Sequence, residues 1–283
     1  MHTQVVGRRV VSPLVPGWVI VDGLPVFHRC AVDAPMSAGA MVHVHGFGIS
    51  GTYLEPTAAL LAPRHPTYVP DLPGMGRSMR PPRPLDLPGL AAALISYCDA
   101  VGVERATFIG NSLGCPLIVE VASRYPDRIE RAVLVSPAGG PNNIPVRRAI
   151  AQMVRDAPRE PLSMVPIAVR DYLRFGVLQG WRLFQAMVRY PTLERVSNLV
   201  MPTLVIAGDR DPLVRVDRVG VFAGLPHVEA VQVSGAHALN FSAPALIAAL
   251  VDAHVRGLPL VAPPGSSASV TPLEVVPLST AGR

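Results

Sequence analysis

The chain has 283 residues, of which 49% are hydrophobic and 16% are charged. This length fits one large α/β domain with an insertion, and the composition allows a sizeable core and excludes intrinsic disorder for most of the chain. No segment approaches the roughly 18 to 20 consecutive apolar residues of a transmembrane helix. Arg8, Arg9, Pro13 and Pro16 interrupt the N-terminal region where a signal peptide needs an apolar run, so we expect a cytoplasmic protein.

The formal net charge of +5 is concentrated in one segment. All 25 basic residues are arginines, and nine of them lie between 141 and 199 with four acids, which is a local excess of five. No basic run contains interleaved aromatic residues, so nucleic acid is not an expected partner. We interpret these arginines as a solvated face, with a preference for anionic substrates or for an anionic surface as the alternative.

The cysteines give no sign of a disulfide framework or a zinc site. Cys30, Cys98 and Cys115 are an odd number, and none has CxxC or Cys/His ligand spacing. We therefore expect buried thiols, no metal and no cofactor.

Short β-branched runs alternate with longer segments of helical periodicity, which is typical of an α/β fold with a mostly parallel sheet. In chain order, the pattern predicts strands at 17–21, 26–31 and 40–45, a helix at 56–62, a strand at 67–69, a helix at 87–101, a strand at 106–109, a helix at 113–125 and a strand at 131–135. After a long interruption it predicts a strand at 203–207, a helix at 214–224, a strand at 230–233 and a helix at 243–255.

The interruption predicts an inserted helical cap, because several helical patterns separated by prolines replace the strands there. We therefore divide the chain into an N-terminal part of the core (1–138), the cap (139–200) and a C-terminal part of the core (201–257). The last residues, 258–283, are rich in proline and serine and lack periodicity, which predicts a mobile tail.

A candidate nucleophile stands where one predicted strand ends. The strand ending at Ile109 continues as Gly110-Asn111-Ser112-Leu113-Gly114 and then as a helical pattern. This is G-x-S-x-G in the strand, turn and helix context that a nucleophilic serine requires, since glycines allow the sharp turn that exposes the hydroxyl. The alternative is an ordinary strand-to-helix loop.

A serine needs a base to become nucleophilic, and the sequence supplies candidates further along. One strand ends in Gly208-Asp209-Arg210-Asp211-Pro212, and the next ends in Ser234-Gly235-Ala236-His237. The carboxyl ends of parallel strands meet at one edge of a sheet, so these groups are expected near Ser112.

Five segments together resemble the α/β-hydrolase superfamily over roughly residues 17–257. They are His45-Gly46-Phe47-Gly48, Asp71-Leu72-Pro73-Gly74-Met75-Gly76-Arg77-Ser78, the serine turn, Gly208-Asp209-Arg210-Asp211 and Gly235-Ala236-His237. The resemblance implies an α/β-hydrolase fold in which Ser112 is the nucleophile, His237 the general base and Asp211 the acid that orients it. It favours Asp211 over Asp209, because the family's acid commonly stands three residues after the glycine that ends the strand. It also implies that the backbone N–H groups of Phe47 and Leu113 form the oxyanion hole.

Other side chains have simpler interpretations. His43 and His45 could be metal ligands, but a metallohydrolase loop would continue with Asp and His, so His45 is expected to hold the oxyanion loop. Asp71 is expected to shape its glycine-rich loop, and Cys115 to pack in the helix after the serine. The cap's Met153, Met164, Met187, Trp181 and Phe184 are interpreted as core, although a cap over an active site must give some apolar side chains to the substrate.

The serine argues against an epoxide hydrolase or a haloalkane dehalogenase, for which the resemblance implies an aspartate. We expect a hydrolase of a carboxylic ester or lactone that acts on a small, largely apolar substrate through an acyl-enzyme. Gly-Asn-Ser-Leu-Gly is also similar to the turn of C–C bond hydrolases of ring-fission diketones, from which Phe47-Gly48-Ile49 and Ala238 depart. That activity and a non-catalytic ligand-binding protein remain the alternatives.

Overall fold

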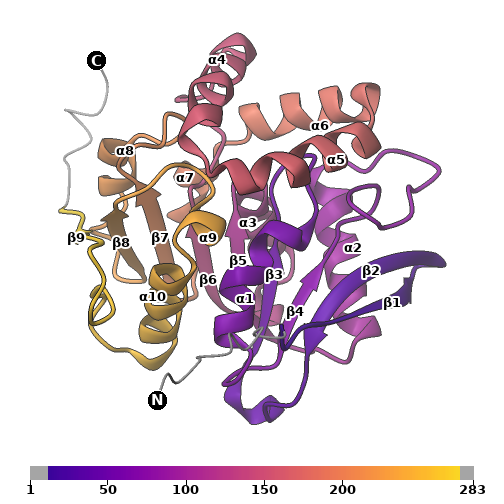
Figure 1. The fold of residues 1–283 in the computed structure, drawn as a ribbon, viewed down its shortest axis with the longest axis horizontal. Helices are drawn as coiled ribbons and strands as arrows, with labels where there is room; N and C mark the ends of the chain where they lie inside the picture. The colour runs from indigo at the N-terminus through magenta and orange to yellow at the C-terminus, as the bar shows by residue number, and fades with distance from the viewer. Residues whose placement is uncertain (1–11, 275–283) are drawn as a thin grey trace, which may run out of the picture.

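The computed structural model describes residues 12–274, apart from the side chains of residues 177–179. Within this range, nine strands form a single mixed sheet in the order β1-β2-β4-β3-β5-β6-β7-β8-β9 (Figure 1). The strands are β1 (Val15–Val21), β2 (Leu24–Ala31), β3 (Ala40–Val44), β4 (Thr67–Pro70), β5 (Ala106–Asn111), β6 (Ile129–Val135), β7 (Thr203–Gly208), β8 (Val228–Val233) and β9 (Val270–Pro272). Strands β3 to β8 are parallel, and the outer strands β1, β2 and β9 are antiparallel to their neighbours.

All eight strands predicted from the sequence are present. Every residue of β3, β5 and β7 is buried, as expected for apolar parallel strands that are covered by helices on both faces. Strand β9 is an addition that the sequence pattern does not predict, and it lies in the segment whose composition indicates a mobile tail. Its three residues pair antiparallel with the end of β8, so part of that segment belongs to the sheet.

Helices cover both faces of the sheet (Figure 1). The helices α1 (Glu55–Leu61) and α10 (Pro244–Arg256) pack on one face, and α2 (Leu87–Ala100), α3 (Gly114–Arg124) and α8 (Val216–Gly220) pack on the other. The helix predicted over 214–224 is regular only over α8, because the chain then continues in tighter turns in which Phe222 and Ala223 bond to carbonyls three residues back. The remaining short pieces of the core are η1 (Met36–Ala38), η2 (Gly51–Leu54), η3 (Pro126–Arg128) and α9 (Leu239–Ser242).

The predicted helical insertion lies between β6 and β7. It contains α4 (Val146–Asp156), η4 (Ala157–Arg159), η5 (Leu162–Met164), α5 (Val165–Phe175), α6 (Val177–Arg189) and α7 (Thr192–Val196). Prolines stand before or in the first turn of several of these elements, where the missing N–H costs no helical hydrogen bond. In Figure 1, α4, α5 and α6 lie across the carboxyl edge of the sheet, and Leu183 and Phe184 of α6 join the core.

The topology places a crevice at this edge. Strands β4 and β5 lie on opposite sides of β3, so the connections leaving β3 and β5 diverge where both strands end. Such a switch point is where open α/β sheets bind their ligands. No helix within residues 12–274 combines the length and the apolar character needed to span a bilayer.

Candidate active site

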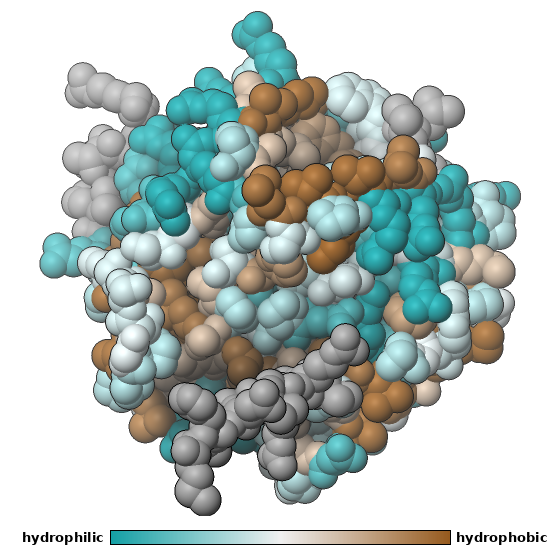
Figure 2. Space-filling view, in the orientation of Figure 1, coloured by the Kyte–Doolittle hydropathy of each residue, from teal (hydrophilic) through white to brown (hydrophobic). Residues whose placement is uncertain are grey.

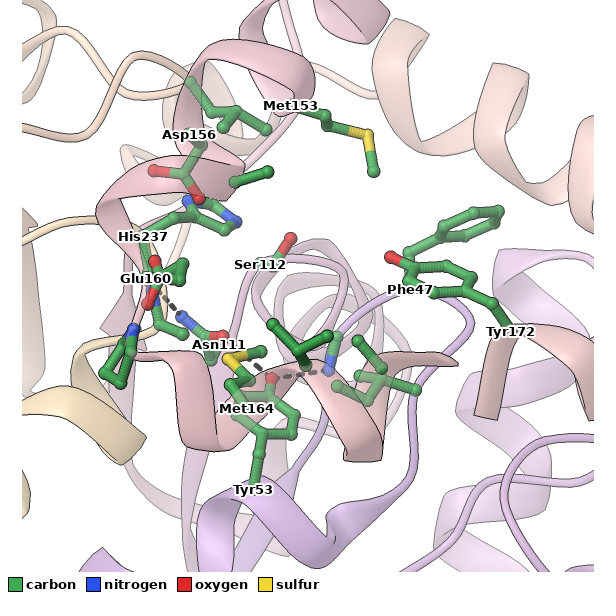
Figure 3. Close-up of a pocket in the computed structure, with 18 of the residues that line it drawn as sticks. Phe47, Tyr53, Asn111, Ser112, Met153, Asp156, Glu160, Met164, Tyr172 and His237 are labelled. Atoms are coloured by element: carbon green, nitrogen blue, oxygen red, sulfur yellow. Dashed lines mark hydrogen bonds between the residues drawn. The ribbon is translucent and has the colours of Figure 1, made fainter. Parts of the chain in front are cut away.

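Ser112 stands in a tight turn between β5 and α3. Its φ is +56°, a left-handed conformation that is costly for a residue with a side chain. A Cβ at Gly114 would overlap the carbonyl oxygen of Val44, and one at Gly110 would lie 2.7 Å from the backbone of Gly114. Glycine is therefore required at both positions, and the turn directs the serine side chain into a cavity (Figure 3).

Asp211 and His237 form a hydrogen-bonded pair. Nδ1 of His237 lies 2.7 Å from Oδ2 of Asp211, whose other oxygen accepts a hydrogen bond of 2.8 Å from the N–H of Leu213. Asp209 faces elsewhere and accepts a hydrogen bond of 2.9 Å from the N–H of Gly235. The structure therefore brings Asp211 to the histidine, and Asp209 shapes the chain between the ends of β7 and β8.

The imidazole of His237 lies across from the hydroxyl of Ser112 (Figure 3). Its Nε2 is buried and has no hydrogen-bond partner among the described residues. Burial lowers the pKa of His237, but the charge and hydrogen bond of Asp211, with smaller contributions from Asp156 and Glu160, outweigh it and raise the pKa to about 9. The pair is thus arranged to hold a proton that arrives at Nε2.

The loop after β3 lies beside the same cavity, which Gly46 and Phe47 line. The N–H groups of Phe47 and Leu113 donate no hydrogen bond within residues 12–274. The preceding N–H, that of Gly46, donates to the hydroxyl of Tyr53 at 2.8 Å, and this hydroxyl donates to Oδ1 of Asn111 at 2.7 Å. The loop after β3 and the serine turn are therefore connected through one buried tyrosine.

His45 fixes the other side of this loop. Its Nε2 accepts a hydrogen bond of 2.8 Å from the N–H of Leu72, so Nδ1 is the protonated nitrogen that donates to the carbonyl of Gly46 at 2.9 Å. Burial lowers the pKa of His45, which favours this neutral form. His43 points into the core, and burial lowers its pKa to about 3. In the described part of the chain, no three His, Cys, Asp or Glu side chains are grouped so as to hold a metal ion.

The position of Cys115 fits a packing role, and that of Asp71 fits a role in shaping its loop. The thiol of Cys115 donates to the carbonyls of Gly110 and Val135, and burial raises its pKa well above the usual value, so it is not a thiolate at neutral pH. The carboxylate of Asp71 is fully buried and accepts from the N–H groups of Gly51 and Arg77, at 2.8 Å each.

The cavity above Ser112 has a volume of about 320 Å³ and mostly apolar walls. Its cap side chains include Met153, Met164, Val165, Val169, Tyr172 and Met187. A second cavity of about 570 Å³ is lined by Ile150, Val154, Phe175, Trp181 and Phe184, and it shares Phe47, Met153 and Tyr172 with the first. The methionines and aromatics that the sequence pattern suggests as core therefore also line the cavities.

Two acidic residues of the cap reach the site, although no sequence pattern marks them as candidates. Glu160 accepts a hydrogen bond of 2.7 Å from the N–H of Ala238, and Asp156 lies beside His237 (Figure 3). Burial raises the pKa of Asp156 to about 7, with His237 opposing the rise and the Glu160 carboxylate adding to it. No local motif surrounds either residue, so only the folded cap reveals their position.

The sheet, the serine turn and the cap across the carboxyl edge define an α/β hydrolase. The sequence profile of the alpha/beta hydrolase family matches residues 41–250, and the chain belongs to this family.

The sequence identity between this chain and individual proteins of known sequence or structure is modest. The chain is 28% identical over 191 residues to a poly(3-hydroxyalkanoate) depolymerase of Ectopseudomonas oleovorans, which is 60% of this chain and 67% of that protein. It spans about half the length of three uncharacterized mycobacterial relatives, at 26% identity. Among solved structures, a membrane phospholipase A matches with a TM-score of 0.74 at 21% identity, over 87% of both chains. The enol-lactonase of Burkholderia xenovorans matches with a TM-score of 0.69 at 21% identity, over 85% of this chain and all of that one.

Proposed function

We propose that this protein is a serine hydrolase that cleaves a carboxylic ester or lactone through an acyl-enzyme. The observation that supports this most directly is the arrangement of three side chains: Ser112 in a left-handed turn, across from a histidine whose Nδ1 is held by Asp211 at 2.7 Å. In an ordinary strand-to-helix loop we would not expect a serine in this left-handed conformation, because the conformation costs free energy.

In the first half of the reaction, Oγ of Ser112 attacks the carbonyl carbon while Nε2 of His237 accepts the hydroxyl proton. The electron pair of the carbonyl moves to its oxygen, and the N–H groups of Phe47 and Leu113 donate hydrogen bonds to the resulting anion. When the intermediate collapses, the bond to the alcohol oxygen breaks, and this oxygen takes the proton from His237. The alcohol leaves, and the acyl group remains on Ser112.

In the second half, a water molecule replaces the alcohol. His237 accepts a proton from the water as its oxygen attacks the acyl carbon, and the collapse of the second intermediate returns that proton to Oγ of Ser112. The products are a carboxylic acid and the free enzyme. Through its hydrogen bond to Nδ1, Asp211 stabilises the imidazolium form of His237.

The cavities support an apolar substrate. The walls next to Ser112 are mainly methionine, valine and aromatic side chains, and the second cavity extends the apolar space beyond Phe47 and Met153. Ester or lactone cleavage is also the activity implied by the names of the depolymerase and the enol-lactonase described above. We therefore extend the expected substrate from a small ester to one with a flexible apolar acyl chain.

Labelling with a fluorophosphonate probe and a panel of p-nitrophenyl esters of increasing chain length test this proposal. Ser112→Ala should abolish labelling and lower kcat by about 10³ to 10⁶ while the protein remains folded. Ser123→Ala is the matched control, because Ser123 bonds only to the carbonyl of Val119 within α3. Near-full activity of Ser112→Ala would disprove the serine mechanism. Turnover of a vinylogous diketone without turnover of the esters would favour the C–C hydrolase.

A further inference from the structure

Helix α5 exposes an unusual apolar face. Val165, Val169 and Leu173 are spaced four residues apart, so they lie on one side of the helix, and Leu162 precedes them in η5. Leu173 is 81% exposed and Leu162 is 87% exposed. Figure 2 shows the result as a hydrophobic band over α5, with a second hydrophobic area over α4. We call these four residues the α5 ridge. An apolar ridge that is exposed to solvent indicates a site of contact with another molecule.

The ridge is continuous with the cavity above Ser112, and other exposed apolar side chains of the cap line the second cavity. Val165 and Val169 of the ridge also line the cavity above Ser112. On α4, the exposed Ile150 and Val154 line the second cavity, together with the exposed Trp181 of α6. The exposed apolar surface of the cap therefore includes side chains that line each of the two cavities.

The exposed charge of the cap is more strongly positive than the sequence count indicates. All nine arginines between 141 and 199 are exposed. Of the four acids in this segment, Asp156 and Asp171 are buried and Glu160 is half-buried, so Glu194 is the exposed one. Two of the arginines have acidic partners, Arg170 with Asp171 and Arg195 with Glu120. The other seven, among them Arg155, Arg159 and Arg174, have no acidic partner in the described part of the chain. Arg155 directly follows the exposed Val154, and Arg174 directly follows Leu173 of the ridge.

These arginines do not serve a ligand inside the site. Among the described residues, no arginine lines either cavity, so the arginines of the cap do not contact a ligand bound next to Ser112. The positive charge therefore acts on something outside the cavities. A membrane leaflet that contains acidic lipids has an apolar acyl region beneath a layer of anionic headgroups. An apolar helix face flanked by exposed arginines is complementary to such a leaflet.

We propose that the cap docks on an anionic lipid surface, with the α5 ridge in the acyl region and the flanking arginines at the headgroups. Both cavities then open toward the lipid, and an ester carried in the membrane reaches Ser112 along an apolar route. The docking step is independent of the proposed chemistry, so it can be tested on the full-length protein with or without activity.

Sedimentation with vesicles tests the docking. The protein should bind vesicles of phosphatidylcholine with about 30% phosphatidylglycerol more tightly than vesicles of phosphatidylcholine alone, and added salt should weaken the binding. Leu162→Ser/Leu173→Ser should lower the partition coefficient by about 10-fold or more, because both side chains lose apolar burial in the bilayer. Arg155→Gln/Arg159→Gln should lower binding to the anionic vesicles and leave binding to the neutral ones unchanged.

Matched controls separate docking from folding and from chemistry. Val32→Ser/Val261→Ser removes two aliphatic side chains that are exposed outside the cap, and it should bind like the unmodified protein. Leu162 and Leu173 line neither cavity, so their double variant should still hydrolyse a short soluble ester. Ser112→Ala should bind vesicles normally even if the proposed chemistry is wrong.

Three results would overturn the proposal. The first is an unmodified protein that shows no preference for anionic vesicles, and the second is a ridge variant that binds as well as the Val32/Val261 control. The third is a dimer that light scattering detects and the ridge variant abolishes, without any vesicle binding, which would assign the ridge to contact with a second copy of the chain.

Discussion

The side-chain amide of Asn111 donates a hydrogen bond of 3.1 Å to the backbone carbonyl of His237. The same amide donates to the carbonyl of Val135 at 3.1 Å, and its oxygen accepts from Tyr53. Asn111 therefore connects the serine turn, the histidine loop and, through Tyr53, the loop after β3. These three segments come from distant parts of the chain, and their relative positions determine how Ser112, His237 and the Phe47 N–H lie toward one another.

Removing the tyrosine hydroxyl tests this connection. Tyr53→Phe leaves the N–H of Gly46 and Oδ1 of Asn111 buried without their partner, so the free energy of unfolding should fall by about 1 to 3 kcal/mol. Because the loop that presents the Phe47 N–H loses its anchor, kcat should also fall by about 10-fold. Urea unfolding and ester hydrolysis measure the two effects.

Tyr97→Phe is the appropriate comparison. The Tyr97 hydroxyl is also buried and bonds to Nδ1 of His28 at 2.8 Å, away from the cavities. This variant should lose stability and retain kcat. Equal losses of kcat in both variants would mean that the Tyr53 effect reflects stability alone.

A second prediction concerns the choice between two aspartates. Asp211→Asn should lower kcat severely, and Asp209→Asn should not, because only Asp211 accepts a hydrogen bond from His237. In serine proteases, the corresponding change from Asp to Asn lowers kcat by about 10⁴, because the histidine is held in the wrong tautomer. Circular dichroism should confirm that both variants fold. Two mild effects would remove Asp211 from the mechanism.

The strands and helices of the core were predictable because short sequence segments determine them. Short, largely apolar, β-branched runs such as 203–207 favour buried strands between helices, and the glycines two positions before and after Ser112 indicate a turn that no larger residue fits. The order of strand ends then placed Asp211 and His237 at one edge. The choice of Asp211 over Asp209 came from the family resemblance, and the hydrogen bond to His237 agrees with it.

The cap was predictable only as a set of helices. Asp156 reaches His237 because α4 ends there and the chain turns over the site, and no periodicity in the sequence specifies that contact. The same holds for the α5 ridge, since Val165, Val169 and Leu173 have the spacing of an ordinary buried helix face. Strand β9 is too short for a period and is defined by its pairing with β8.

A third prediction concerns the wall between the two cavities. Met153 lines both, so Met153→Ala should widen the passage and increase kcat/KM for long acyl chains relative to short ones by about 5-fold. Met164→Ala enlarges only the cavity above Ser112 and serves as the control. Esters with about 4 and about 10 acyl carbons measure the ratio, since the longer chain needs more apolar volume than the shorter one. If Met153→Ala leaves the ratio of kcat/KM for long and short acyl chains unchanged, the second cavity does not take part in substrate binding.

The last prediction concerns pH. In the proposed mechanism His237 must be neutral to accept the proton of Ser112, so with its pKa raised to about 9, kcat/KM should increase with pH and level off above that value. Asp156 is ionised above its own pKa of about 7, and its charge then stabilises the imidazolium form. Asp156→Asn removes this charge, so the pKa of His237 should fall and the rise in kcat/KM should move to lower pH.

The position of the pH profile, and not its height, distinguishes an electrostatic effect from a structural one. For Asp156→Asn, the ratio of kcat/KM at neutral pH to its alkaline plateau should increase by about 3-fold or more, since one pKa unit changes the neutral fraction by about 10-fold. Glu160→Gln should shift the profile in the same direction, because Glu160 also raises the pKa of His237. Asp217→Asn, which removes a partly exposed acid of α8 that is paired with Arg215, should leave the profile in place. A profile that Asp156→Asn does not move would show that the charge of Asp156 does not reach the imidazole, and Asp211 and Glu160 would then account for its raised pKa.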